Sequence, residues 1–321
     1  MKKFTTRFSA VLFTLILLTQ PAHATQSLVP VGQVIAIELG CAHVRVADFD
    51  ETVDIAKSAG LQVGDRITKV DDYTVTSIED VRNALKCSDG TVHLQSLRDG
   101  KQKDIRLEPA ITSDGPRLGV YLQQGITGVG TVTYYDPDSK TIAALGHGVS
   151  TAEGELISMT DGAVYRATVE SVRKGKIGNP GQLMGKLADK TPLGILSKNT
   201  PQGIFGKAMA SFSGNALPIA QAGTIKTGPA TILSTIAGST VQEYSVEILK
   251  VYPNSGATGR NMLLKVTDPV LLDATGGIVQ GMSGSPIIQD GKLVGAVTHV
   301  LVNDPTTGYG IFIENMLDAA A

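Results

Sequence analysis

Cysteine is scarce in this sequence, where Cys41 and Cys87 are the only two among 321 residues. Neither has a partner at a spacing typical of metal-ligand motifs, so the pattern argues against a metal site. In an oxidising compartment the two thiols could form a disulfide. Otherwise they would be two small buried apolar residues, and the sequence does not give the Cα separation that decides between these alternatives.

An excess of charge of one sign is also lacking. The formal net charge is −2 and 18% of the residues are charged, which argues against broad affinity for nucleic acid or for anionic membranes. No glycine-rich phosphate loop opens a helix, so nothing supports nucleotide binding. What is present is 42% hydrophobic residues and 36 glycines, a composition that predicts a folded, β-rich, soluble protein of two domains.

Long apolar runs are limited to the N-terminus, where a basic start precedes the run from Phe8 to Leu18. That run is too short to span a bilayer comfortably, so we expect no stable transmembrane span. Ala22-His23-Ala24 then offers the small-x-small site of a signal peptidase. We interpret residues 1–24 as a cleaved signal peptide and expect an exported protein, either periplasmic, in an intermembrane space or secreted.

A first domain follows the signal peptide. Alternating apolar residues from Val34 to Leu39 predict a strand. Ser77 followed by Asp80 has the pattern of a capping box and predicts a helix that runs to Leu85. Two further strands are expected on either side of the turn Asp99-Gly100.

The segment Ala59–Ile67, with its Gly-Leu and Val-Gly-Asp pattern, resembles part of a PDZ domain, and we assign residues 27–109 to such a domain. A PDZ domain binds an extended peptide by adding a strand to a sheet edge beside a helix. The ligand would then lie between the Val34–Leu39 strand and the Ser77–Leu85 helix. It would be a segment of this chain or of a membrane protein; alternatively, the groove serves as an interdomain contact.

Residues 110–117, rich in proline and small polar residues, are predicted to be a linker. Residues 118–321 contain many short β-branched runs separated by glycine and proline turns, which predict a sandwich or barrel. The stretch from Ile313 to Ala320 is expected to form a closing helix.

The stretch Gly281–Pro286 places Ser283 between glycines and ahead of an apolar hairpin. Small neighbours let a substrate backbone approach the hydroxyl, and the amides of Gly281 and Ser283 could converge on an oxyanion. A glycine-rich β-turn without catalytic role is the alternative. His147, on a second glycine-lined turn, favours the catalytic interpretation, because it could serve as the base. His299 is the competing histidine.

The histidine-first, serine-last order and the sequence after Ser283 resemble the second barrel of chymotrypsin-like serine peptidases. A closer resemblance, covering nearly the whole mature chain, is to the stage IV sporulation protein B peptidase family. The motifs that carry it are Gly128–Thr131, Tyr135–Pro137, Ala144–His147, Lys174–Gly175, Gly178–Gly181, Thr267–Pro269, Gly276–Gln289, Thr298–Val300, Val302–Pro305 and Gly308–Gly310. The loop Gly148–Thr151, next to the base, departs from the family pattern.

The resemblance implies a mostly β protein, in which a PDZ domain is followed by a chymotrypsin-like double β-barrel peptidase domain. It implies a triad of His147, Asp268 and Ser283, which needs no cofactor or metal. Asp161 and Asp273 are alternative acids, because Asp268 lies close to the serine in sequence. Family members resemble a signalling peptidase that cuts itself and then a specific membrane-associated regulatory protein.

Two other functions remain open at this stage. A PDZ peptide-binding adaptor with an inactive peptidase-like barrel would carry the same motifs with misplaced catalytic groups. A general quality-control protease of the high-temperature-requirement kind is disfavoured, because those chains usually place the peptidase before the PDZ domain.

Overall fold

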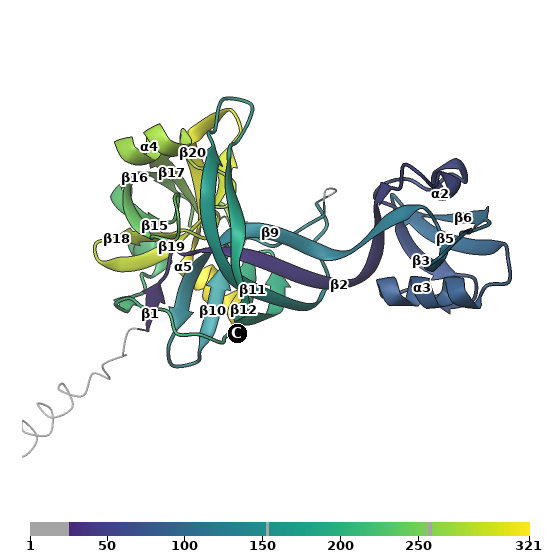
Figure 1. Ribbon diagram of the computed structural model, residues 1–321. Coiled ribbons are helices and arrows are strands. Elements are labelled where there is room, and N and C mark those ends of the chain that lie inside the picture. Colours follow the sequence, from purple (N-terminus) through teal and green to yellow (C-terminus); the bar gives the residue numbers. More distant parts are fainter. Residues whose placement is uncertain (1–25, 152–153, 254, 256–258) are drawn as a thin grey trace, which may run out of the picture.

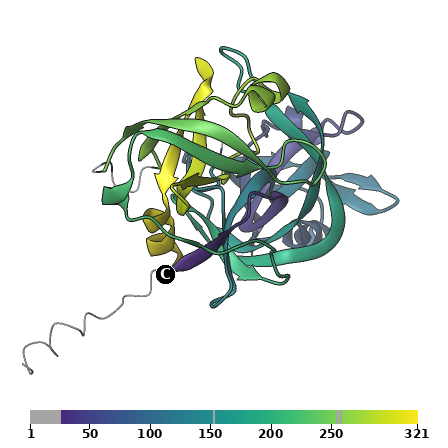
Figure 2. The ribbon, with the colours of Figure 1, turned by 90° about the vertical axis from the view of Figure 1, so that its left-hand side faces the viewer.

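The computed structural model describes residues 26–151, 154–253, 255 and 259–321, so the predicted signal peptide lies outside the described residues. The molecule is elongated, with a double barrel at one end and a smaller lobe at the other (Figure 1). Two long antiparallel strands, β2 (Val34–Phe49) and β9 (Val120–Asp136), run through both parts. Viewed along the long axis, the smaller lobe lies behind the barrels (Figure 2).

The first barrel closes because β2 and β9 pair with each other as well as with their other neighbours. Alternate residues of β2, including Ile35, Ile37 and Leu39, belong to its buried apolar cluster, as expected for a strand with one face in a core. The barrel strands, in spatial order, are β9, β10 (Thr141–Ala144), β13 (Gly203–Ala208), β12 (Gln182–Thr200), β11 (Met159–Arg173) and β2. The short strands β1 (Ser27–Pro30) and β14 (Leu217–Pro218) extend this sheet beside β9.

The second barrel is also closed, and a shared apolar cluster joins the two. Val34 and Leu183 of the first barrel lie in the same cluster as Ile232 and Ile287 of the second. The strands in spatial order are β15 (Gly228–Ser234), β16 (Gln242–Val251), β17 (Met262–Val266), β20 (Asp304–Phe312), β19 (Lys292–Leu301) and β18 (Pro286–Gln289). The helical elements are η1 (Ala222–Thr224), α4 (Pro269–Thr275) and α5 (Ile313–Ala320). The closing helix was predicted with these same bounds.

The smaller lobe has its own apolar cluster, built around Ile67, Val81 and Leu94. Its helix α3 (Ile78–Cys87) begins at the predicted capping box, with Ser77 and Asp80 each accepting a hydrogen bond from the other's backbone amide. The remaining elements are α2 (Ile55–Ser58), β3 (Arg66–Val70), β4 (Tyr73–Thr74), β5 (Val92–Arg98), β6 (Lys101–Leu107), β7 (Ala110–Thr112) and β8 (Gly115–Arg117).

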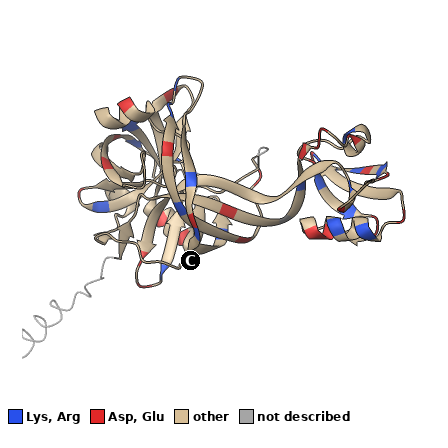
Figure 3. Cartoon of the chain, in the orientation of Figure 1, with Lys and Arg blue, Asp and Glu red and all other residues tan. Residues whose placement is uncertain are grey.

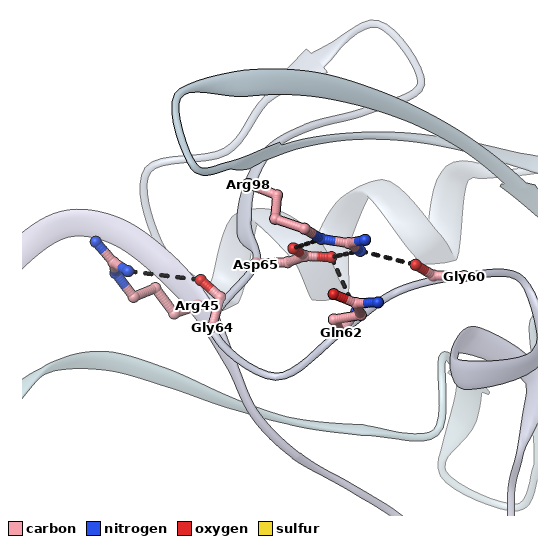
Figure 4. A network of polar contacts seen from close by, with 6 residues as sticks. All are labelled: Arg45, Gly60, Gln62, Gly64, Asp65 and Arg98. Atoms are coloured by element: carbon pink, nitrogen blue, oxygen red, sulfur yellow. Dashed lines mark hydrogen bonds and ion pairs between the residues drawn. The ribbon is translucent and has the colours of Figure 1, made fainter. Parts of the chain in front are cut away.

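A buried ion pair organises the PDZ-like segment of this lobe (Figure 4). Asp65 is fully buried and accepts two 2.6 Å hydrogen bonds from Arg98, one to each carboxylate oxygen. The Gln62 amide donates to the same carboxylate, and Arg98 also donates to the Gly60 carbonyl. This fully hydrogen-bonded arrangement explains the Gly-Leu and Val-Gly-Asp pattern, because a buried carboxylate is tolerated only when its oxygens are paired.

The lobe is an insertion in the first barrel, which differs from the predicted division at 27–109 and 118–321. Residues from Ser27 to Leu39 pair with barrel strands, whereas the later part of β2, from Val44, packs in the lobe. The buried positions of β2 shift at this change of partner, from odd residues up to Cys41 to even residues from Val44, and the register with β9 is irregular at the same place. The fold class itself is confirmed: the chain is mostly β, with a PDZ-like lobe and a double barrel.

The predicted ligand groove beside Val34–Leu39 was wrong, because that segment pairs with β9 on one edge and with β11 on the other. The strand beside α3 is instead the start of β9, whose residues Val120 and Leu122 line a hollow of about 580 Å³ together with Val81 of α3. On this stretch β9 pairs with β2 along one edge. No strand of the described chain pairs with the other edge of β9 there.

Cys41 is buried in β2, Cys87 is exposed at the end of α3, and the two are not bonded. Acidic and basic side chains are interspersed over the lobe and the barrels (Figure 3). Over the described ranges, no three histidine, cysteine or acidic side chains gather to hold a metal ion. None of the helices described there is long and apolar enough to cross a membrane.

Candidate active site

Ser283 lies in a turn between α4 and β18, and residues of the first barrel contact this turn. Gly281 and Gly284, on either side, have φ values of 99° and 96°, which favour glycine. The Thr131 amide donates to the Ser283 carbonyl at 3.0 Å, and the Thr131 hydroxyl donates to the Gly281 carbonyl at 2.8 Å. A Cβ at Gly284 would clash with the backbone of Thr131 and Leu145. The turn that bears Ser283 is thus fixed by contacts with the opposite barrel.

The amides of Gly281 and Ser283 are left available by this turn. The amides of Gln280, Met282, Gly284 and Ser285 all donate to backbone carbonyls. Those of Gly281 and Ser283 have no hydrogen-bond acceptor among the described residues. Two unpaired amides beside a serine hydroxyl are what an oxyanion site requires.

His147 follows β10 on a sharp turn in which Leu145 and Gly146 both have positive φ. Its Nδ1 lies 2.9 Å from the Gly148 carbonyl oxygen. Because a carbonyl can only accept, Nδ1 carries the hydrogen and the neutral ring presents an unprotonated Nε2. Burial lowers the pKa of His147 below its usual value, and the Gly148 hydrogen bond partly opposes that shift. A neutral ring of this tautomer is suited to act as a general base.

His147 and Ser283 line the same hollow, of about 330 Å³, between the two barrels. Gly281 lines it as well. The Ser283 hydroxyl does not point to His147, because it donates to the Thr298 carbonyl at 2.7 Å. The hydroxyl must therefore rotate before it can donate to His147, and catalytic hydrogen bonds are often incomplete in structures without substrate.

His299, the competing histidine, lies near this hollow without lining it. Its ring centroid is 5.0 Å from that of His147. The pKa of His299 is lowered, first by desolvation of the ring and then by the charges of His147 and Arg260. The residue as a whole is exposed.

The three candidate acids lie away from this hollow. Asp268 caps α4: one oxygen accepts from the amides of Val270 and Leu271, and the other accepts from the Ser245 amide at 3.3 Å. Asp161 accepts a hydrogen bond from its neighbour Thr160, and Asp273 forms an exposed ion pair with Lys174. In the described chain none of the three is hydrogen-bonded to His147. The structure brings together His147, Gly281 and Ser283, and it places Asp268 at a helix terminus.

Asn199, at the end of β12, was not singled out from the sequence. Its side chain donates to the carbonyls of Val149 and Ile157 and accepts from the Val149 amide, each at 2.9 Å. These bonds hold the loop that begins at His147. An asparagine near the end of a strand usually indicates a turn, so the sequence alone does not identify this role for Asn199.

Comparison with known families gives two matches. The family model described as SpoIVB peptidase S55 matches residues 114–317. A PDZ domain model matches residues 54–98.

Three solved structures similar to this chain are described as proteases, and each has low sequence identity to it. The Rv3671c protease from M. tuberculosis in its active form is 15% identical, with a TM-score of 0.38, and the match covers 74% of this chain and 82% of that one. Its inactive form is 15% identical, with a TM-score of 0.35 and coverages of 60% and 82%. An HtrA-type protease, AlgW, solved with a tripeptide, is 13% identical, with a TM-score of 0.36 and coverages of 60% and 54%.

Proposed function

We propose a function from one premise: the chain belongs to the SpoIVB peptidase S55 family and is a serine peptidase. It is an exported endopeptidase that cleaves itself and a specific membrane-associated regulatory protein through an acyl-enzyme. The observation that carries the catalytic part is the shared hollow, which is lined by His147 with its neutral ring and by Gly281 and Ser283 with their unpaired amides. Export is supported by the pattern of residues 1–24 alone.

The chemistry follows from these groups. The Ser283 hydroxyl rotates away from the Thr298 carbonyl, gives its proton to His147 Nε2 and attacks the substrate carbonyl carbon. The oxyanion accepts hydrogen bonds from the amides of Gly281 and Ser283. His147 returns the proton to the leaving amine, and the amide bond breaks. Water, deprotonated by His147, then hydrolyses the acyl-enzyme and releases Ser283.

Asp268 as the acid that orients His147 stays a prediction from the family resemblance. In this structure its oxygens accept three backbone amides, which accounts for the residue without a catalytic role. Such an acid would accept a hydrogen bond from His147 Nδ1, but Nδ1 is already bonded to the Gly148 carbonyl.

The PDZ-like lobe would deliver a peptide segment, of the chain itself or of a membrane protein. The unpaired edge at the start of β9 beside α3 is suited to strand addition. Arg82, Lys86 and Arg117 line this hollow together with Asp50 and Asp114, so both signs of charge are available to a ligand.

The test compares the mature protein with Ser283→Ala, each incubated alone and with a fluorophosphonate probe, and follows intact mass. Labelling and self-cleavage in the wild type that disappear in the variant are the expected result. Absence of labelling and self-cleavage in both proteins, even with peptides added for the lobe, would favour the peptide-binding adaptor. The Ser283–Thr298 hydrogen bond is the observation that supports that alternative.

A further inference from the structure

Gly128, in the middle of β9, has no packing reason to be glycine. Its φ is not in the left-handed region, so any residue could adopt its conformation. A Cβ at this position would meet no described atom within 4 Å. Gly130, two residues further along the same strand, is different, because a Cβ there would clash with Leu145 and approach Ile37. Glycine weakens a strand interior and often marks the close approach of a ligand or another backbone.

Gly128 lies where two hollows meet. The first is the hollow of about 330 Å³ that contains His147 and Ser283. The second, of about 650 Å³, is lined by residues of β2, β9, β11 and β12, among them Tyr165 and Leu187. Ile37, Gly128 and Val129 belong to the walls of both. The two hollows therefore adjoin at Gly128.

The two hollows differ in chemistry. The first has Ile37, Leu39, Ile126 and Leu145 in its wall and no lysine, arginine, aspartate or glutamate among its lining residues. The second includes Glu38 and Lys190. A charged side chain placed beside Ser283 would lose hydration and find no carboxylate, lysine or arginine among the lining residues. One placed in the second hollow could find either sign of charge.

We propose that the substrate chain crosses β9 at Gly128, with an apolar side chain next to the scissile bond in the first hollow and the continuing chain in the second. Gly128 is then a specificity-determining residue, because the absence of its side chain opens the passage. The inference rests on the proposed peptidase function and names the substrate class of its site.

The test uses the mature protein with Gly128→Val and Gly128→Ala, and Gly223→Ala as matched control. Gly223 also has an ordinary φ and no neighbour within 4 Å of a Cβ, but it lines neither hollow. Each protein digests a mixed library of linear peptides, whose cleavage sites and rates are read by mass spectrometry. Each is also titrated with a small fluorophosphonate, which needs only Ser283 and its base. Thermal unfolding checks that the variants fold.

We expect the wild-type protein to cleave peptides that have Val, Ile, Leu or Met beside the scissile bond. Peptides with a charged residue at that position should be cleaved at least about 10-fold more slowly. Gly128→Val should lower peptide cleavage at least about 10-fold more than it lowers labelling, with Gly128→Ala in between and Gly223→Ala like the wild type. Labelling that persists while Gly128→Val cleaves the same sites at the wild-type rate would overturn this inference alone. Absence of wild-type labelling would overturn the proposed function and the inference together.

Discussion

The turn of Ser283 and the loop after His147 are held in different ways. The Gly281 and Ser283 carbonyls are bound by Thr131 of the opposite barrel, and Gly284 packs against that barrel's backbone. Gly146, before His147, also lies close to the opposite barrel, but the loop after His147 is tied to its own barrel through the side chain of Asn199. The position of Ser283 is therefore set by the packing of the two barrels, and the loop after His147 by a small set of hydrogen bonds. The base should be the easier of the two to displace.

The largest effect should come from the base itself. His147→Ala removes the only imidazole that lines the described part of the hollow, and we expect fluorophosphonate labelling of Ser283 to fall on the order of 10³-fold or more. His299→Gln, the matched control, should lower it by less than about 10-fold, because His299 does not line that hollow. If His299→Gln abolished labelling and His147→Ala did not, the two histidines would exchange roles.

The next prediction compares Asn199, which holds the loop after His147, with Thr131, which holds the turn of Ser283. Asn199→Ala leaves backbone groups of Val149 and Ile157 without their partners, and we expect labelling to fall about 10- to 100-fold at a temperature where the variant is folded. Thr131→Val removes one hydroxyl but keeps the amide that binds the Ser283 carbonyl, so labelling should fall less than about 10-fold.

Asn199→Asp keeps the acceptor for the Val149 amide but turns a carboxylate oxygen toward the carbonyls of Val149 and Ile157, which the amide group bound as a donor. Because these oxygens repel one another, labelling at or below that of Asn199→Ala is expected. If Thr131→Val were the more damaging substitution at equal folded fraction, the comparison between the two loops would be reversed.

The pH dependence of labelling tests the electrostatics of the base. Burial places the pKa of His147 below 6.5, and the neutral ring is the active form. Labelling should therefore rise with pH through a midpoint below 6.5 and be constant above it. The charge of His147 lowers the pKa of His299, so the two rings interact, and the midpoint in His299→Gln measures how much of the wild-type midpoint belongs to His147 alone. A midpoint above 6.5 in the wild type would show that His147 gains a stabilising anion in solution, such as the carboxylate that the family resemblance predicts.

Local chemistry carried much of the sequence-based prediction. The capping box at Ser77, the bounds of α5 and the turns that bear His147 and Ser283 depend on residues adjacent in sequence, and each is found in the structure. The partner change along β2 and the loop contacts of Asn199 depend on pairings far apart in the chain. The buried positions of β2 do change parity between Cys41 and Val44, but such a shift does not identify the new partner strand. The contacts of Asn199 leave no local pattern at all.

The smallest effect concerns Asp268, and it separates a capping role from a catalytic one. Asparagine caps helices about as well as aspartate, whereas alanine does not, so Asp268→Ala should lower the free energy of unfolding by about 1 kcal/mol and Asp268→Asn by much less. If the residue only caps α4, as its hydrogen bonds indicate, Asp268→Asn should keep wild-type labelling. A loss of labelling in Asp268→Asn, with unchanged stability in denaturant, would show that the charge acts on His147. Such a result would require an active arrangement in which Asp268 gives up backbone amides and hydrogen-bonds the imidazole. His147 would then have a side-chain support from the second barrel besides that of Asn199 in the first.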